Sequence, residues 1–442
     1  MARRFQRRSE HGSDPGAGER CQSARNEPAV GLPILPSRSP ARPRTPGRRP
    51  RPSGSAIDGL GRCICLAVWC SLAGIEGRAA EPPIKAADRL TIRMTDARQL
   101  TGSIVVEARD GSVLLEQDDG RYRLLEPGQI DAREPAATAE PAGARKLGEA
   151  ILAELPAGFD LLITKHYLIC FDTSRDYARW CGGIFERLHD AFGNYWTRAG
   201  LEVTDPARPL VVVIFADRRA YETHAAVDLG AAADRVAGYY NLLSNRITTY
   251  DLTGSDALAA ARGRRPGATG MAILSSPAAA GLVSTLVHEA THQLAFNGGL
   301  HQRLAPVPLW VSEGIATFFE TPDLTSPRGW RGVGEVNPPR LERFLAGQHR
   351  GLIETIVRDD EGFRNADTAL DCYAAAWAVT HHLARTRKRE FAGYLKVLAA
   401  KRPLAEDSPA ERLADFRAAF GEPADLEEAV VLAAARLAAR RR

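Results

Sequence analysis

The stretch Leu286-Val287-His288-Glu289-Ala290-Thr291-His292 sets two histidines four residues apart, with a glutamate directly after the first. Apolar residues recur around it at helical spacing, and Asn297-Gly298-Gly299 is typical of a helix C-terminus, so the pattern predicts a helix over 281–296. Residues four apart lie on one face of a helix, and both imidazoles can therefore share one metal ion. Glu289 lies beside them and can reach a water on that ion.

A third ligand is expected from a second helix further along the chain. Zinc in enzymes is commonly held by three protein ligands, with one position left open. Glu313 lies twenty-one residues after His292, in a segment Trp-Val-Ser-Glu-Gly (310–314) whose apolar pattern predicts another helix. His301 is the alternative third ligand, or else a histidine on a surface loop. The spacing therefore predicts a zinc site that contains His288 and His292, with Glu313 or His301 as the third ligand.

The two segments together resemble a known group of metalloenzymes. An H-E-x-x-H pattern followed about twenty residues later by W-x-x-E-G-x-A is similar to the gluzincin clan, which includes thermolysin and the alanyl aminopeptidases. The order of elements resembles most closely the peptidase-MA-like zinc metallopeptidase domains of exported bacterial proteins of unassigned function. This resemblance covers residues 160–400 and implies that His288, His292 and Glu313 bind Zn²⁺ and that Glu289 is the general base.

The resemblance also bears on the reaction. It implies hydrolysis of peptide bonds by a metal-activated water, with Glu289 taking the water's proton and passing it to the leaving amine. The amine-recognition motif of the aminopeptidases, G-x-M-E-N, is absent, because the matching segment Gly238-Tyr239-Tyr240-Asn241 lacks the glutamate. We therefore expect an endopeptidase rather than an aminopeptidase, acting on a peptide or protein substrate.

The tetrahedral oxyanion of such a reaction needs a hydrogen-bond donor besides the metal. In the gluzincin clan a tyrosine or histidine of the helical C-terminal part supplies it, which makes Tyr373 the candidate here and His381 the alternative. Tyr373, Trp377 and His381 recur every four residues on one helix face, a pattern that packing in a helix core also explains. Glu320, seven residues beyond Glu313, is expected either to orient a ligand histidine, or to face solvent or pair with a helix N-cap.

The order of predicted elements indicates an α+β fold that begins with a small all-β unit. Residues 88–131 predict a three- or four-stranded meander, with tight turns at Asp110-Gly111 and Asp119-Gly120. Residues 132–146, rich in Ala, Pro, Glu and Thr, predict a linker to the next domain.

The second domain is expected over 147–442 and is metallopeptidase-like. Its first lobe, 147–300, should hold a small mixed sheet and the metal-binding helix, and its second lobe, 301–442, should be helical. The hairpin predicted over 238–250 could present an edge strand to an extended substrate, or be an ordinary surface hairpin. Further helices are predicted over 174–196, 307–320, 339–347, 367–387, 390–400, 408–420 and 424–441.

The N-terminal residues differ in composition from the rest of the chain. Residues 1–56 are rich in Arg, Pro, Gly and Ser without an apolar period, which predicts a disordered basic leader. The apolar run 63–73 is about as long as a signal-peptide core and too short to span a bilayer. Residues 57–80 therefore predict a signal peptide and an exported protein, either periplasmic, in the cell envelope or secreted; a buried apolar segment is the alternative.

Charge and cysteine content limit the possible partners. Residues 1–55 contribute +8 to the net charge of +4, so the rest of the chain sums to −4 and gives no reason to expect nucleic-acid binding. No membrane-spanning segment is expected beyond the signal peptide, and no pattern indicates an oligomeric state. Cys170 and Cys181 could pair after export, but buried free thiols are the expectation.

The sequence thus predicts a zinc metallopeptidase. The alternative is a catalytically silent protein of the gluzincin fold with a binding or structural role in the cell envelope. A third interpretation, a helical protein with a chance H-E-x-x-H, leaves the Glu313 segment unexplained. The presence of Glu289 together with all three ligand residues favours the enzyme.

Overall fold

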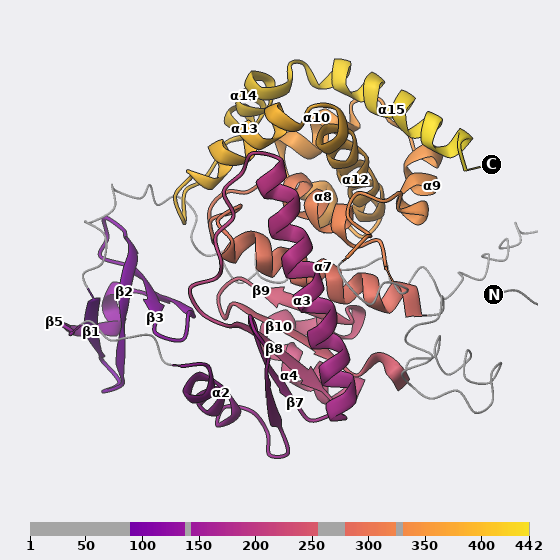
Figure 1. The fold of residues 1–442 in the computed structure, drawn as a ribbon. Coiled ribbons are helices and arrows are strands. Elements are labelled where there is room, and N and C mark those ends of the chain that lie inside the picture. The colour runs from indigo at the N-terminus through magenta and orange to yellow at the C-terminus, as the bar shows by residue number, and fades with distance from the viewer. Residues whose placement is uncertain (1–88, 138–142, 255–278, 324–329, 442) are drawn as a thin grey trace, which may run out of the picture. The chain divides into compact units, whose positions relative to one another are not determined.

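The computed structural model describes residues 89–137, 143–254, 279–323 and 330–441. Within them the fold is α+β, as predicted, with two five-stranded sheets and twelve α-helices. An all-β region comes first along the chain and a helical region comes last (Figure 1). The leader predicted over 1–56 and the signal peptide predicted over 57–80 lie outside the described residues. Among the described helices, none combines the length and apolarity needed to cross a membrane.

The first sheet is the predicted β unit. Its strands are β1 (Arg89–Met94), β2 (Gln99–Glu107), β3 (Val113–Gln117), β4 (Tyr122–Leu125) and β5 (Ile130–Pro135). They pair antiparallel in the order β4-β3-β2-β1-β5, so a four-stranded meander gains a fifth strand that returns to β1. The sequence did not signal β5 because Ile130 is its one large apolar residue. Gly111 and Gly120, with φ of 86° and 84°, form the two expected tight turns.

The second sheet is mixed and supports the site. Its strands are β6 (Asp160–Ile163), β7 (Tyr167–Phe171), β8 (Leu210–Phe215), β9 (Gly238–Asn241) and β10 (Arg246–Tyr250), in the order β6-β7-β8-β10-β9. β7, β8 and β10 run parallel, while β6 and β9 are antiparallel edge strands of this sheet. Every residue of β8 is buried, as its continuous apolar run predicts for a central strand. The predicted hairpin at 238–250 is present as β9 and β10.

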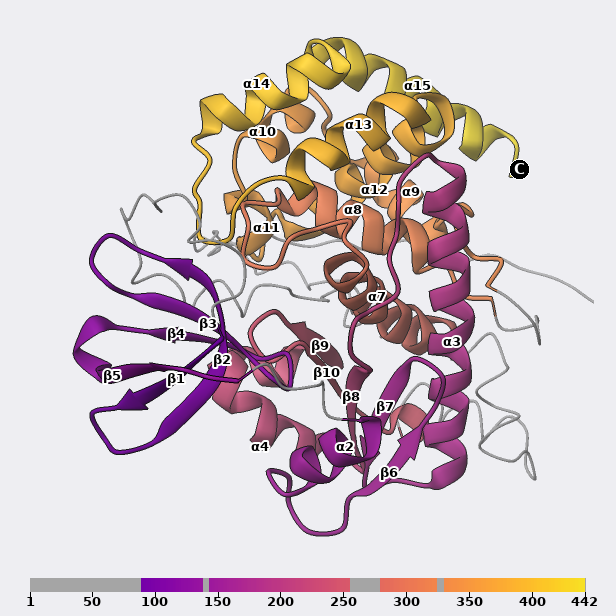
Figure 2. The same cartoon turned by 60° about the vertical axis from the view of Figure 1, so that its left-hand side comes forward.

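Three helices accompany this sheet: α2 (Ala144–Leu152), α3 (Arg175–Arg198) and α4 (Arg218–Leu229). Ser174 begins α3 by accepting a hydrogen bond from the Tyr177 backbone N–H, and Asp217 begins α4 in the same way. The long α3 runs from the sheet to the C-terminal helices (Figure 2). There Tyr195 of α3 donates to the carbonyl of Ala384 over 3.3 Å. Cys170 of β7 and Cys181 of α3 are buried free thiols, as expected.

The remaining helices form the C-terminal region. They are α7 (Ala280–Asn297), α8 (Leu309–Phe319), α9 (Pro338–Ala346), α10 (Leu352–Arg358), α11 (Glu361–Arg364), α12 (Ala369–Thr386), α13 (Lys388–Ala399), α14 (Pro409–Phe420) and α15 (Pro423–Ala439). All but the short α10 and α11 match predicted ranges to within a few residues. All residues of α8 are buried, and α8 packs closely against α12. A Cβ at Gly314 would lie 2.1 Å from Thr380 Oγ1, so only glycine allows this approach.

The β unit contacts the turn between β9 and β10. The backbone N–H of Tyr122 donates to the carbonyl of Leu243 over 2.8 Å. Arg303 places its guanidinium carbon 3.6 Å from the centre of the Tyr122 ring and donates to the carbonyl of Leu242 over 3.2 Å. These contacts hold the turn that follows β9, and β9 reaches into the site described next.

Candidate metal centre

Helices α7 and α8 bring the three predicted ligands together. His288 Nε2 and His292 Nε2 lie 3.1 Å apart, and both face Glu313 Oε2, at 3.0 and 3.5 Å. The spacing of four residues on α7 aligns the two imidazoles, and the packing of α8 against α7 supplies the carboxylate. All three side chains are buried.

The three ligand atoms have the spacing that a tetrahedral metal ion requires. Metal–ligand bonds of about 2.0–2.1 Å place neighbouring ligand atoms roughly 3.3–3.4 Å apart. The observed separations of 3.0, 3.1 and 3.5 Å bracket that value. The second oxygen of Glu313, Oε1, is also buried and makes no hydrogen bond with any described residue. Two imidazoles and a carboxylate are a donor set that zinc accepts, so these residues fit a divalent ion.

Glu320, the C-cap residue that follows α8, orients one of the predicted ligands. Its Oε2 lies 2.8 Å from His288 Nδ1, and its Oε1 accepts hydrogen bonds from Asn337 Nδ2 and Arg340 Nε. When a carboxylate accepts a hydrogen bond from the Nδ1–H group, the lone pair of Nε2 is left to point at the shared centre. Glu320 is buried, so the solvent-facing alternative for this residue is wrong.

The electrostatics of the three side chains and Glu320 follow from this crowding. Burial disfavours a charged imidazolium, but the carboxylates of Glu313 and Glu320 outweigh it and raise the pKa of His288 to about 10. Burial likewise opposes ionisation of Glu313, yet the neighbouring His292 and His288 lower its pKa well below the usual range.

Glu289 lies next to the triad and is held by a backbone donor. Its Oε2 accepts a hydrogen bond of 2.8 Å from the backbone N–H of Tyr240, on edge strand β9. Burial raises the pKa of Glu289, and the nearby His288 opposes that shift. Sequence reasoning missed the contribution of Tyr240, because a backbone N–H carries no residue signature. Only the pairing of β9 with β10 brings this donor beside α7.

The two candidates for the oxyanion donor occupy different surroundings on α12. Tyr373 is buried against Phe363, with ring centroids 5.5 Å apart, and beneath Arg340, whose guanidinium carbon lies 5.3 Å from its ring centre. Its link to the triad runs through Arg340 and Glu320. His381 packs against Trp377 at 5.2 Å, and burial together with Arg385 lowers the pKa of His381 to about 4.

His301, the alternative third ligand, does not join the convergent group. In this group, the ligand atoms that lie within 4.8 Å of one another belong to His288, His292 and Glu313. His301 is buried with its ring edge-on to Phe296, and burial and His292 lower its pKa to about 3. The surface-loop alternative for His301 is also wrong, since its ring is 2% exposed.

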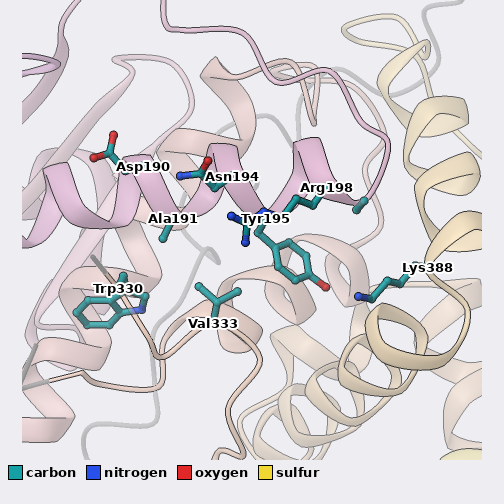
Figure 3. Close-up of a pocket in the computed structure, with 9 residues that line it drawn as sticks. Asp190, Ala191, Asn194, Tyr195, Arg198, Trp330, Val333 and Lys388 are labelled. Carbon is teal, nitrogen blue, oxygen red and sulfur yellow. The ribbon is translucent and has the colours of Figure 1, made fainter. Parts of the chain in front are cut away.

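A cavity of about 440 Å³ lies apart from these residues, beside α3 (Figure 3). Trp330 and Val333 lie across it from Tyr195, and Lys388 closes one end (Figure 3). Its lining is Asp190, Ala191, Asn194, Tyr195, Arg198, Ala199, Trp330, Val333 and Lys388. None of the predicted catalytic or metal-binding residues is among them, so the chemistry of the triad gains no support from this cavity.

Comparison with known proteins matches part of the chain to a family. Residues 282–405 match the model of the family described as "Protein of unknown function (DUF1570)". The matched segment begins within α7 and contains His288, His292, Glu313 and Glu320. It leaves out the β unit, the second sheet and the last two helices. No curated protein matches the chain.

Proposed function

We propose that this chain is a zinc-dependent peptidase of the gluzincin type. The observation that carries the proposal is the position of Glu289 beside three buried ligand atoms with the spacing of a tetrahedral metal site. A bound zinc ion would act as a Lewis acid that makes a water more acidic at neutral pH and polarises the scissile carbonyl. The matched family has no described function, so the proposal rests on the residues themselves.

Glu289 is the proposed general base. The Tyr240 N–H holds Oε2, which leaves Oε1 to take the proton of the attacking water and deliver it to the leaving amine. Burial, which raises the pKa of Glu289, brings its proton affinity closer to that of a base working near neutral pH. The hydrogen bond from β9 also limits rotation of the carboxylate, so the base keeps one orientation toward the substrate.

The edge strand β9 is the proposed binding site for the substrate backbone. It is the terminal strand of its sheet within the described residues, and it runs beside α7. An extended peptide can add to such an edge as a further strand, and the contact of this edge with Glu289 would bring the peptide near the triad. This mode of binding suits an endopeptidase, and nothing in β9 supplies a carboxylate for a free amino terminus.

Tyr373 remains the proposed oxyanion donor. The alternative is that it positions the metal ligands through Arg340 and Glu320. Its contact with Arg340 connects it to Glu320 and so to His288. Substituting Tyr373→Phe removes the hydroxyl and keeps the ring packed on Phe363. A donor role predicts a loss of kcat with unchanged metal affinity, whereas a positioning role predicts weaker metal binding as well.

We also propose that the protein acts after export, since the apolar run 63–73 has the character of a signal-peptide core. Fractionation of cells that make the full chain, with a tag at the C-terminus, tests this directly. Accumulation of a shortened product outside the cytoplasm is expected; a full-length product confined to the cytoplasm would contradict it.

The decisive experiment measures metal and cleavage on the same preparations. Wild-type protein should contain a divalent metal and cleave members of a peptide library, and Glu289→Gln should keep the metal while losing about 10²- to 10⁴-fold in rate. Glu222→Gln, a matched change on the surface of α4, should retain both properties. Wild type that binds metal but cleaves nothing would favour the silent binding protein. Wild type that binds no metal at the triad would refute the proposal.

A further inference from the structure

A second group of metal-binding side chains lies outside the proposed active site. His166 precedes β7, His189 is on α3, and Asp205 is in the loop between α3 and β8. One ligand atom from each residue lies within 4.8 Å of the other two. His189 Nε2 is 3.6 Å from Asp205 Oδ1, and the His166 and His189 rings stack with centroids 3.7 Å apart. Three separate segments thus converge on one point.

Glu186 holds His166 in the orientation that a ligand needs. Its Oε2 lies 2.7 Å from His166 Nδ1, while its Oε1 accepts hydrogen bonds from the backbone N–H of His166 and from Thr164 Oγ1. When the Nδ1–H group of His166 donates a hydrogen bond to Glu186, the lone pair of Nε2 stays available to a metal ion. This is the same arrangement by which Glu320 directs His288.

His189 has unsatisfied hydrogen-bonding capacity. Its Nδ1 is buried and makes no hydrogen bond with any described residue, and its side chain is 12% exposed. The two stacked rings lie 15° from parallel, an arrangement that disfavours two positive charges. Neutral imidazoles are the form that binds metal.

We propose that His166, His189 and Asp205 form a second binding site for a divalent transition-metal ion of the zinc type. Two imidazole nitrogens and one carboxylate oxygen are a ligand set that suits zinc. Calcium and magnesium prefer oxygen ligands throughout, so this set does not suit them. Lone pairs lie in the ring planes, so binding requires one of the stacked rings to turn about its Cβ–Cγ bond. Asp205 is 81% exposed and can follow that movement without disturbing the core.

An ion at this site would join three successive segments of the chain. It would tie the start of β7, the middle of α3 and the loop that leads to β8. That loop also meets the end of the active-site helix, because the N–H of Thr204 donates to the carbonyl of Gly298 over 3.2 Å. The second ion is therefore a structural staple beside α7 and takes no part in peptide hydrolysis.

The test is metal stoichiometry in the full chain. Protein stripped with a chelator is titrated with Zn²⁺, freed of excess by gel filtration and analysed for metal. Wild type should hold two equivalents. Asp205→Asn and His189→Ala should each hold one, and His224→Ala, a matched loss of a half-buried histidine on α4, should hold two. Asp205 is exposed, so its substitution leaves a folded protein even where His189→Ala does not.

The outcomes separate this site from the proposed active site. One equivalent in wild type that Asp205→Asn leaves in place overturns the second site. One equivalent that Asp205→Asn removes supports the second site and overturns metal binding at His288. In a Glu313→Ala background, Zn²⁺ should still raise the thermal midpoint, and adding Asp205→Asn should abolish that rise.

Discussion

Both histidine clusters contain a glutamate that contacts an imidazole Nδ1, but they differ in how rigidly the fold holds the side chains. Each sets a glutamate against an imidazole Nδ1, at 2.8 Å for His288 and 2.7 Å for His166. The first cluster is fully buried on two packed helices, whereas the second joins a strand start, a helix and an exposed loop residue. A ligand set carried by helices is fixed before an ion binds, and a set that includes a loop must be completed by it. The fold thus suggests a permanent centre and an adjustable one.

Removing the third ligand of the first cluster should have the largest effect. Glu313→Ala takes away one of three ligands and leaves His288 and His292 without their shared carboxylate. We expect loss of one metal equivalent and of all peptidase activity, because a two-ligand zinc site binds far more weakly. Elemental analysis and peptide cleavage measure both. Asp205→Asn, the corresponding change in the second cluster, should leave the activity intact; equal loss in both variants would show that the clusters are not independent.

The glutamates behind the histidines should matter next. Glu320→Gln keeps the size of the side chain but weakens its hydrogen bond with His288 Nδ1. We expect zinc affinity at the first cluster to fall by about 10- to 100-fold. Glu186→Gln should weaken the second cluster in the same way. Competition with a zinc indicator distinguishes the two. A Glu320→Gln protein with wild-type affinity would show that the hydrogen bond is incidental.

The contrast between the clusters also explains what could be predicted from sequence. The first lies on two apolar helices whose ranges the sequence predicts, and the residue types and their spacing mark His288, His292 and Glu313 as candidate ligands. Helix geometry converts a spacing of four directly into proximity. The second cluster has no such periodic element joining His166, His189 and Asp205, and only the folded sheet brings them together.

Other features were hidden for the same reason. The hydrogen bond from Tyr240 to Glu289 depends on where an edge strand lies, not on which side chain it carries. Strand β5 and helices α10 and α11 are short, and β5 is defined by its pairing with the distant β1 and not by an apolar pattern of its own. Tertiary contacts of this kind override the weak local preferences of short segments.

The close packing that holds Glu313 gives a stability prediction. A Cβ at Gly314 would lie 2.1 Å from Thr380 Oγ1 and 2.8 Å from the carbonyl oxygen of Ala376. Gly314→Ala should therefore destabilise the fold by about 1–3 kcal/mol through overpacking between α8 and α12. Gly393→Ala is the matched control, because nothing lies within 4 Å of its added Cβ in α13, and it should stabilise the fold by about 0.5–1 kcal/mol. Urea denaturation measures both; a neutral Gly314→Ala would mean that α8 can shift.

The clusters should finally differ in how zinc binding responds to pH. Because Glu313 and Glu320 outweigh burial and raise the pKa of His288 to about 10, this residue holds a proton at pH 7 in the metal-free protein. Zinc must displace that proton, so affinity at the first cluster should rise by about tenfold per pH unit and level off only as the pH passes the raised pKa. At His189 the pKa shift has the opposite sign, because burial and the neighbouring His166 lower the pKa. His189 is therefore already neutral at pH 7 and releases no proton when zinc binds. Calorimetry in buffers of different ionisation enthalpy counts the protons. The Asp205→Asn protein, which reports the first cluster alone, should release one proton per zinc from His288, and a proton count of zero there would contradict the charge state inferred for the triad.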